Sequence, residues 1–89
     1  MKYSILATWQ DRERSVTAYV EDDIPFLPPA GMLFRVFQCA LPVTLGEPFW
    51  DRERGMLALS GEMHVDNLDD IVGIFKMMNV KHEVRERDG

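Results

Sequence analysis

The chain has 89 residues, of which 46% are hydrophobic and 28% are charged, a composition that indicates one folded domain spanning residues 1–89. Its net charge of −5 disfavours direct binding to nucleic acid, since its arginine pairs alternate with Asp or Glu, and its single cysteine excludes an internal disulfide. No stretch resembles a signal peptide or approaches the roughly 20 apolar residues of a membrane span, so we expect a cytoplasmic protein with no membrane partner.

Two strands are predicted at residues 2–9 and 15–21 because apolar and polar residues alternate there. One face of the first strand carries Tyr3, Ile5, Ala7 and Trp9, and Leu6 interrupts the polar opposite face. The five residues between the strands fit the connection of a β-hairpin.

The middle of the chain is less regular. Residues 22–31 contain three prolines, which indicates a loop, and residues 42–54 contain Pro42, Gly46 and Pro48, so that any strand there is broken or lies at an edge. Residues 32–41 fit either of two readings. Their aromatic and β-branched residues favour a strand buried on both faces, whereas a stripe at helical spacing favours a helix.

The C-terminal part predicts a strand, a helix and a second strand. Residues 56–65 alternate, with Gly61 indicating a bulge or the close approach of a neighbour. A helix is expected over residues 67–79, with Asp66 as its cap and Asn79 in the left-handed conformation at its end. Its core stripe would consist of Leu68, Ile71, Val72, Phe75 and Met78. A strand over residues 80–86 follows, with Val80 and Val84 facing inward.

These elements predict an α+β fold. We expect one mixed sheet of four to five strands, with the helix on one face and a C-terminal β-α-β crossover. If residues 32–41 are helical, the arrangement becomes a ferredoxin-like variant.

A short motif occurs twice. Trp-Gln-Asp-Arg-Glu-Arg at residues 9–14 is echoed by Trp-Asp-Arg-Glu-Arg at residues 50–54. The echo predicts two solvated turns of alternating charge. A functional interpretation places both turns at one end of the sheet as a paired recognition edge, because Trp and Arg dominate binding hot spots.

No motif for catalysis or for a cofactor is present. The histidines, His64 and His82, are predicted to face opposite sides, no ligand pair has the spacing of a zinc site, and no glycine-rich phosphate loop occurs. We therefore expect a protein without catalytic, cofactor-binding or metal-binding residues.

The predicted helix carries more apolar surface than its core stripe needs. Ile74 and Met77 lie on its flank, which is either a contact surface or covered by residues 22–31 or by Phe49 and Trp50. The candidate partner-binding residues are thus Ile74, Met77, Trp9, Arg12, Trp50 and Arg52.

The sequence favours a small acidic protein-binding domain, acting as an inhibitor, an adaptor or an accessory subunit of a larger complex. Small acidic inhibitors from phages or mobile elements offer an analogy of size and charge. The alternative is a regulatory domain, dimeric in that case, that holds a small metabolite near Gly61 and the helix start. The identity of the protein partner and the existence of a homodimer are left open.

Overall fold

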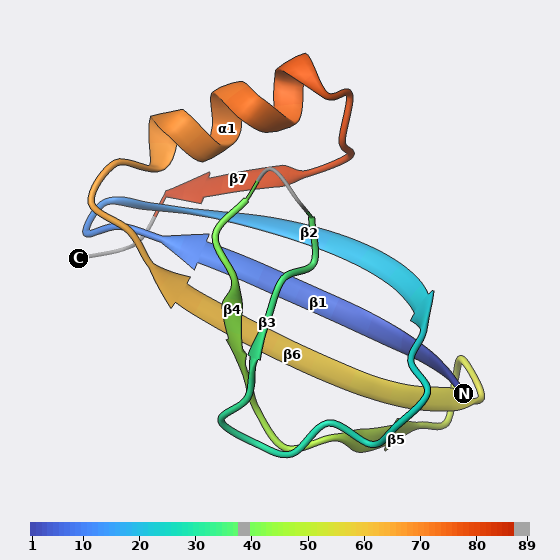
Figure 1. The fold of residues 1–89 in the computed structure, drawn as a ribbon. Coiled ribbons are helices and arrows are strands. Elements are labelled where there is room, and N and C mark those ends of the chain that lie inside the picture. The colour runs from blue at the N-terminus through green and yellow to red at the C-terminus, as the bar shows by residue number, and fades with distance from the viewer. Residues whose placement is uncertain (38–39, 87–89) are drawn as a thin grey trace.

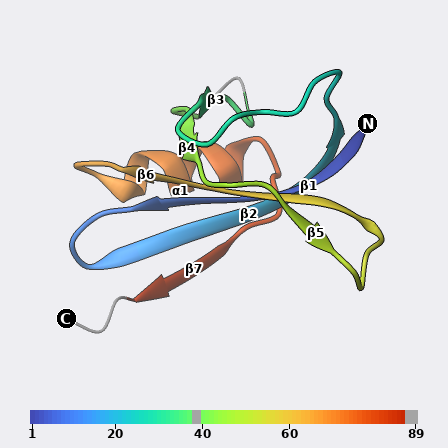
Figure 2. The same cartoon turned by 90° about the horizontal axis from the view of Figure 1, so that it is seen from below.

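The computed structural model describes residues 1–37 and 40–86, which form a mixed sheet of seven strands and one helix. In chain order the elements are β1 (Lys2–Gln10), β2 (Arg14–Asp23), β3 (Leu33–Phe34), β4 (Val43–Leu45), β5 (Phe49–Asp51), β6 (Met56–His64), α1 (Leu68–Met77) and β7 (Glu83–Glu86). The helix lies over one face of the sheet (Figures 1 and 2). The fold is α+β as expected, with more strands than the predicted four to five.

The strand order is β3-β4-β6-β1-β2-β7, and β5 also pairs with β6. The β1–β2 hairpin is confirmed, with Ala7 opposite Ala18 in its register. The pairing of β1 with β6 is parallel, and every other pairing among the described residues is antiparallel. This arrangement makes β1, with its four buried apolar side chains, a central strand.

The C-terminal crossover spans two other strands. The strands β6 and β7 run in the same direction, but β1 and β2 lie between them, and α1 packs over these two. At the outer edge, Val84 is exposed, contrary to the inward orientation that we predicted. The physical reason is that the helix covers the middle of the sheet and leaves β7 at its margin.

The helix α1 begins and ends close to the predicted positions. Its cap is Asn67, whose side chain accepts a hydrogen bond from the Asp69 N–H, so the prediction of Asp66 was wrong by one residue. At the other end Asn79 has a φ of 58°, the left-handed conformation that was predicted. Met78 is exposed rather than in the core stripe, because it is already the C-cap.

Residues 32–41 form neither a buried strand nor a helix where the structure describes them. Only Leu33 and Phe34 are in a strand, Arg35 is irregular, residues 36–37 form a bend, and residues 38–39 lie outside the described chain. The ferredoxin-like variant required a second helix here, and the described residues contain none. The segment instead packs on the core through Phe37, so its apolar pattern reflects irregular burial.

Residues 42–54 contribute two short strands to the same edge of β6. The strand β4 pairs near Gly61 and β5 pairs near Ala58, with a break at Gly46 to Pro48, as the prolines and the glycine predicted. The close approach predicted at Gly61 is confirmed. An ideal Cβ at Gly61 would lie 2.4 Å from the Cγ2 of Val43 on β4.

An aromatic cluster fills the layer between the sheet and the helix. The ring centroids of Trp9 and Phe75 are 5.3 Å apart, and those of Phe37 and Phe75 are 5.5 Å apart, both edge to face. The Trp9 indole N–H donates to the Leu41 carbonyl at 2.9 Å. Trp9 and Phe75 are fully buried, which makes this cluster the centre of the core.

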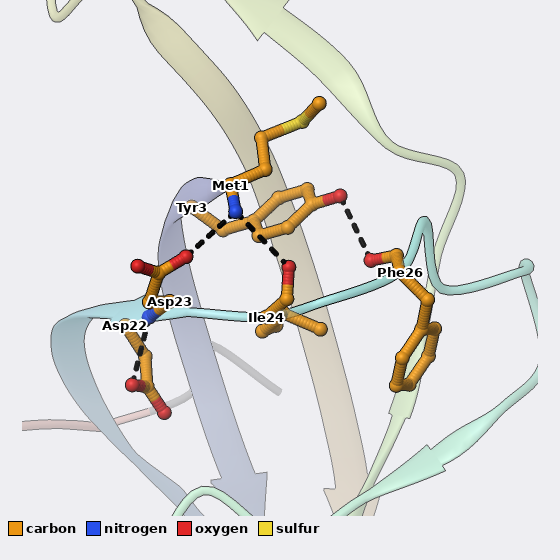
Figure 3. Close-up of polar contacts among 6 residues, drawn as sticks. All are labelled: Met1, Tyr3, Asp22, Asp23, Ile24 and Phe26. Carbon is orange, nitrogen blue, oxygen red and sulfur yellow. Dashed lines mark hydrogen bonds and ion pairs between the residues drawn. The ribbon is translucent and has the colours of Figure 1, made fainter.

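Near the N-terminus, polar contacts connect β1 with the end of β2 and with the loop that follows it (Figure 3). The Tyr3 hydroxyl donates to the Phe26 carbonyl at 3.0 Å and so holds the loop after β2 against the sheet. The Met1 amino group donates to the Asp23 carboxylate at 2.6 Å. That ion pair lowers the pKa of Asp23.

Candidate functional site

Within the described residues, no helix lies over the sheet face opposite α1 (Figure 2). Alternate residues of β1 point to this side, and the register aligns Leu6 with Tyr19 on β2 and with Ser60 on β6. Small polar side chains surround Leu6, including Thr8 and Thr17, whose hydroxyls are 3.2 Å apart. Leu6 is thus an exposed apolar side chain among polar neighbours on this face.

Four side chains form what we call the open-face patch: Leu6, Tyr19, Phe49 and Arg54. Leu6 is 47% exposed, Tyr19 is 38% exposed and Phe49 is 56% exposed. The Arg54 guanidinium lies over the Tyr19 ring, 5.0 Å from its centroid, which is a cation–π distance. These four side chains line a shallow pocket of about 160 Å³. The patch therefore combines exposed apolar surface with an ordered arginine.

The repeated Asp-Arg-Glu-Arg motif has the same local structure at both of its positions. The Asp11 carboxylate accepts hydrogen bonds from the N–H groups of the second and third residues after it, at 2.8 and 2.7 Å. The Asp51 carboxylate accepts the equivalent pair at 3.1 and 3.3 Å. This geometry makes the echo a turn motif, in which an aspartate closes its own turn.

The hydrogen bonds lower the pKa of both aspartates. For Asp11 the main cause is the bond from the Arg14 N–H, followed by that from Glu13. For Asp51 the main cause is the side chain of Arg54, whose guanidinium lies 2.7 Å from its carboxylate. The arginine at the equivalent position of the first turn, Arg14, instead pairs with Asp69 at the start of α1, at 2.5 Å.

The two turns lie at opposite ends of the sheet (Figure 1), so the paired recognition edge does not form. Because β1 and β6 are parallel, the end of β1 and the start of β6 are remote from each other. Arg12 and Arg52 are both exposed, each at its own turn.

The tryptophans of the two motifs also differ. Trp9 is fully buried and is not accessible to a partner, whereas Trp50 is 62% exposed. Trp9 lies two residues before its aspartate and on a central strand. Trp50 lies one residue before its aspartate and on the edge strand β5, beyond the cover of the helix.

The helix flank divides into two environments. Ile74 is half-buried and faces a groove of about 420 Å³, which it lines together with Arg35, Leu41 and Ile71. Arg35, Ala40 and Leu41, rather than residues 22–31 or Phe49 and Trp50, thus border the flank. Met77 is 80% exposed, on the solvent side of α1. Ile74 therefore lines the groove, whereas Met77 is not among its lining residues.

The titratable side chains of the described residues form no group of three that could hold a metal ion. His64 ends β6 on the uncovered face, 3.4 Å from the side-chain amide of Gln10. His82 lies against Phe75 beside the helix and is 2.7 Å from the Val80 carbonyl. His82 also lines a cavity together with Leu6 and Tyr19, which places it at the margin of the sheet.

A wider groove runs along the junction of β4 and β6. It measures about 610 Å³, and its polar lining comes from Thr44, Ser60, Glu62 and His64. Gly61 itself is not part of it, because Val43 and Leu45 cover that glycine on the core side. The groove is open to solvent along the uncovered face.

Sequence reasoning missed the open-face patch, although one signal was present. Leu6 stands where the alternation of the first strand calls for a polar residue, and Tyr19 stands at the matching place on the second strand. Phe49 and Arg54 carry no such signal, since only the pairing of β5 with β6 brings them to this face.

Comparison with protein-family models, with curated proteins and with solved structures finds no match to this chain. Among the described residues, no helix has the length and the apolar content that crossing a bilayer requires.

Proposed function

We propose that this chain is a protein-binding domain without catalytic residues of its own, which acts as an inhibitor, an adaptor or an accessory subunit of a larger complex. The observation that carries the proposal is the open-face patch. Three apolar side chains on three strands remain exposed on a face that a helix could have covered. Exposed apolar clusters with aromatic and arginine side chains are typical of the anchor regions of protein interfaces.

The geometry of the patch favours a protein over a small ligand. Its pocket of about 160 Å³ is smaller than the roughly 300–1,000 Å³ of small-molecule sites. A pocket of this size accommodates one side chain of a partner. Phe49 and Trp50, consecutive on β5 and both more than half exposed, extend the apolar surface around the edge of the sheet.

We also propose that the protein is cytoplasmic and does not bind nucleic acid directly. In the described residues Arg14, Arg54 and Arg85 each form an ion pair with a carboxylate of the same chain. Paired arginines leave little positive potential for phosphates, which supports a protein partner.

The test needs the native partner, captured from the host by pull-down and identified by mass spectrometry. Replacement of either Tyr19 or Phe49 by alanine should then weaken binding by roughly 30-fold or more, since one anchor residue contributes about 2 kcal/mol or more. Calorimetric titration would measure the loss, and circular dichroism should show an unchanged fold, because both side chains are exposed.

The matched control is Met77→Glu on the helix flank. Met77 is more exposed than either patch residue, and it lies on the opposite side of the sheet. If the partner still binds after the Tyr19 and Phe49 substitutions but no longer binds after Met77→Glu, the binding site lies on the helix flank. That outcome would refute the role of the open-face patch.

A regulatory domain for a small metabolite is the second candidate, and the polar groove between β4 and β6 supports it. Its volume of about 610 Å³ lies within the range of ligand sites. Thermal melting against a metabolite panel separates the candidates, since a ligand that binds only the folded state raises the melting temperature. A shift of several degrees that His64→Ala removes would favour the metabolite.

A further inference from the structure

The outer edge of β2 is only partly occupied. The strand β7 pairs with residues 14–17 of β2, and the strand partners of β2 among the described residues are β1 and β7 alone. Residues 18–23 therefore have no strand on their outer side within the described chain. Figure 1 shows β7 along one part of β2, with the remainder of that edge uncovered. We call residues 18–23 the open edge of β2.

We propose that an extended, basic segment of a partner protein pairs with the open edge of β2 and continues the sheet beside β7. This inference rests on the proposed protein-binding function and names the chemistry of the partner. The open edge is six residues long, which corresponds to about 20 Å of strand. That length matches a short peptide strand.

Backbone hydrogen bonding is the first argument. In an antiparallel ladder, alternate residues direct their N–H and C=O groups to one neighbouring strand, and the intervening residues direct theirs to the other. The open edge pairs with β1 over its whole length, so alternate residues direct both groups outward, and of these the Asp23 N–H already donates to the Asp22 carboxylate at 2.8 Å, which leaves Tyr19 and Glu21 to pair with an added strand. Such an edge is a template for an added strand, the mode of recognition known as β-augmentation.

The negative charge of the open edge is the second argument, and it indicates that the partner strand is basic. The open edge ends in three consecutive exposed carboxylates, Glu21, Asp22 and Asp23. Lys2, 3.4 Å from Glu21, and the Met1 amino group compensate two of them, which leaves the edge negative. A second copy of this chain would bring the same carboxylates to the interface, whereas a basic strand would complement them.

A side-chain pocket at the start of the open edge is the third argument. Thr17, Tyr19, Lys81 and His82 line this cavity of about 230 Å³ together with Leu6. Because Leu6 and Tyr19 also belong to the open-face patch, a strand on the open edge would place alternate side chains next to that patch. The edge and the patch then form one continuous binding surface.

The experiment uses the full chain and a nine-residue peptide in which Val alternates with Lys. Amide hydrogen exchange measured by NMR at low salt should show slower exchange at alternate residues of the open edge when the peptide is added. A peptide with Glu in place of Lys, and one with a central proline, should produce no protection, since the first reverses the charge and the second removes a donor.

A charge-reversal variant tests the contribution of the carboxylates of the open edge. The double substitution Glu21→Lys and Asp22→Lys should weaken the Val–Lys peptide by about tenfold, as expected for the loss of two favourable charge contacts. The control is Glu47→Lys, an exposed carboxylate outside the open edge, which should leave the affinity unchanged.

Three outcomes would overturn the inference: no protection of residues 18–23, protection with the Glu peptide as well, or protection that rises with protein concentration alone, which would assign the edge to a second copy. These outcomes are distinct from failure of the proposed function. If binding of the native partner requires Tyr19 and Phe49 but tolerates the double substitution Glu21→Lys and Asp22→Lys, the proposed protein-binding function stands. Only the proposed pairing at the open edge of β2 would then be wrong.

Discussion

Replacement of Phe75 by alanine should destabilise the fold by about 3–5 kcal/mol, the range for truncation of a buried phenylalanine. Phe75 is fully buried, and its ring contacts Trp9 and Phe37 edge to face. It is the residue through which the only helix of the described chain meets the aromatic cluster. A cavity there would leave Trp9, a central-strand residue, without its main packing partner.

The magnitude matters because the domain is small. Natural domains have total stabilities of roughly 5–15 kcal/mol, and a chain of this length falls toward the lower end. The variant should therefore be largely unfolded or melt at a much lower temperature. Urea denaturation followed by circular dichroism would measure the change in the free energy of unfolding.

Met77→Ala is the matched control on the same helix. Met77 is exposed to solvent, so its truncation should change the free energy of unfolding by about 0.5 kcal/mol or less. Equal losses in Phe75→Ala and Met77→Ala would contradict the assignment of Phe75 to the core, and would indicate that the helix faces the sheet differently.

Substitution of Gly61 by alanine should destabilise the protein by about 1–3 kcal/mol, the typical result of overpacking a core. The new Cβ would lie 2.4 Å from one methyl carbon of Val43 and 3.0 Å from its Cβ. Valine is stiff about χ1 and cannot rotate this methyl away without cost. The strand β4, which lies between β3 and β6, would then have to move away from β6.

Two variants make this prediction specific. In the Val43→Ala background the cost of Gly61→Ala should fall, because the clashing methyl is gone, and a double-mutant cycle would measure the coupling. Gly73→Ala should have the opposite sign, with a gain of up to about 1 kcal/mol, since alanine favours a helix and nothing lies within 4 Å of the added Cβ. A Gly61→Ala protein as stable as the parent would exclude the close contact between β4 and β6.

The open-face patch cannot be predicted from the residue pattern of any single strand, because its side chains come from several strands. The alternation of β1 identified its core face correctly, and Leu6 was the one residue that departed from it. The importance of Leu6 emerges only when Tyr19 and Phe49 join it from two other strands. For the same reason, Trp9 and Trp50 have similar neighbours in sequence and opposite burial in the fold.

Local chemistry was sufficient where the signal for an element lies within a few positions along the chain. The β1–β2 hairpin, the strand β6, the helix α1 with Asn79 at its end and the break between β4 and β5 all follow from alternation, turn residues and capping within a few positions. The sequence by itself thus determined the three long strands, the helix and the α+β fold class, whereas the short strands β3, β4 and β5 were not assigned.

The tertiary structure decided what depends on distant partners. Parallel pairing of β1 with β6 placed the two Asp-Arg-Glu-Arg turns at opposite ends, and Phe37 packs on Trp9 and Phe75 from a segment that is not helical. The strand β7 pairs only with residues 14–17 of β2, and residues 18–23 of β2 therefore form an open edge. The physical reason is that burial and hydrogen-bond satisfaction of an edge depend on which strand lies beside it, and local propensity carries no information about that neighbour.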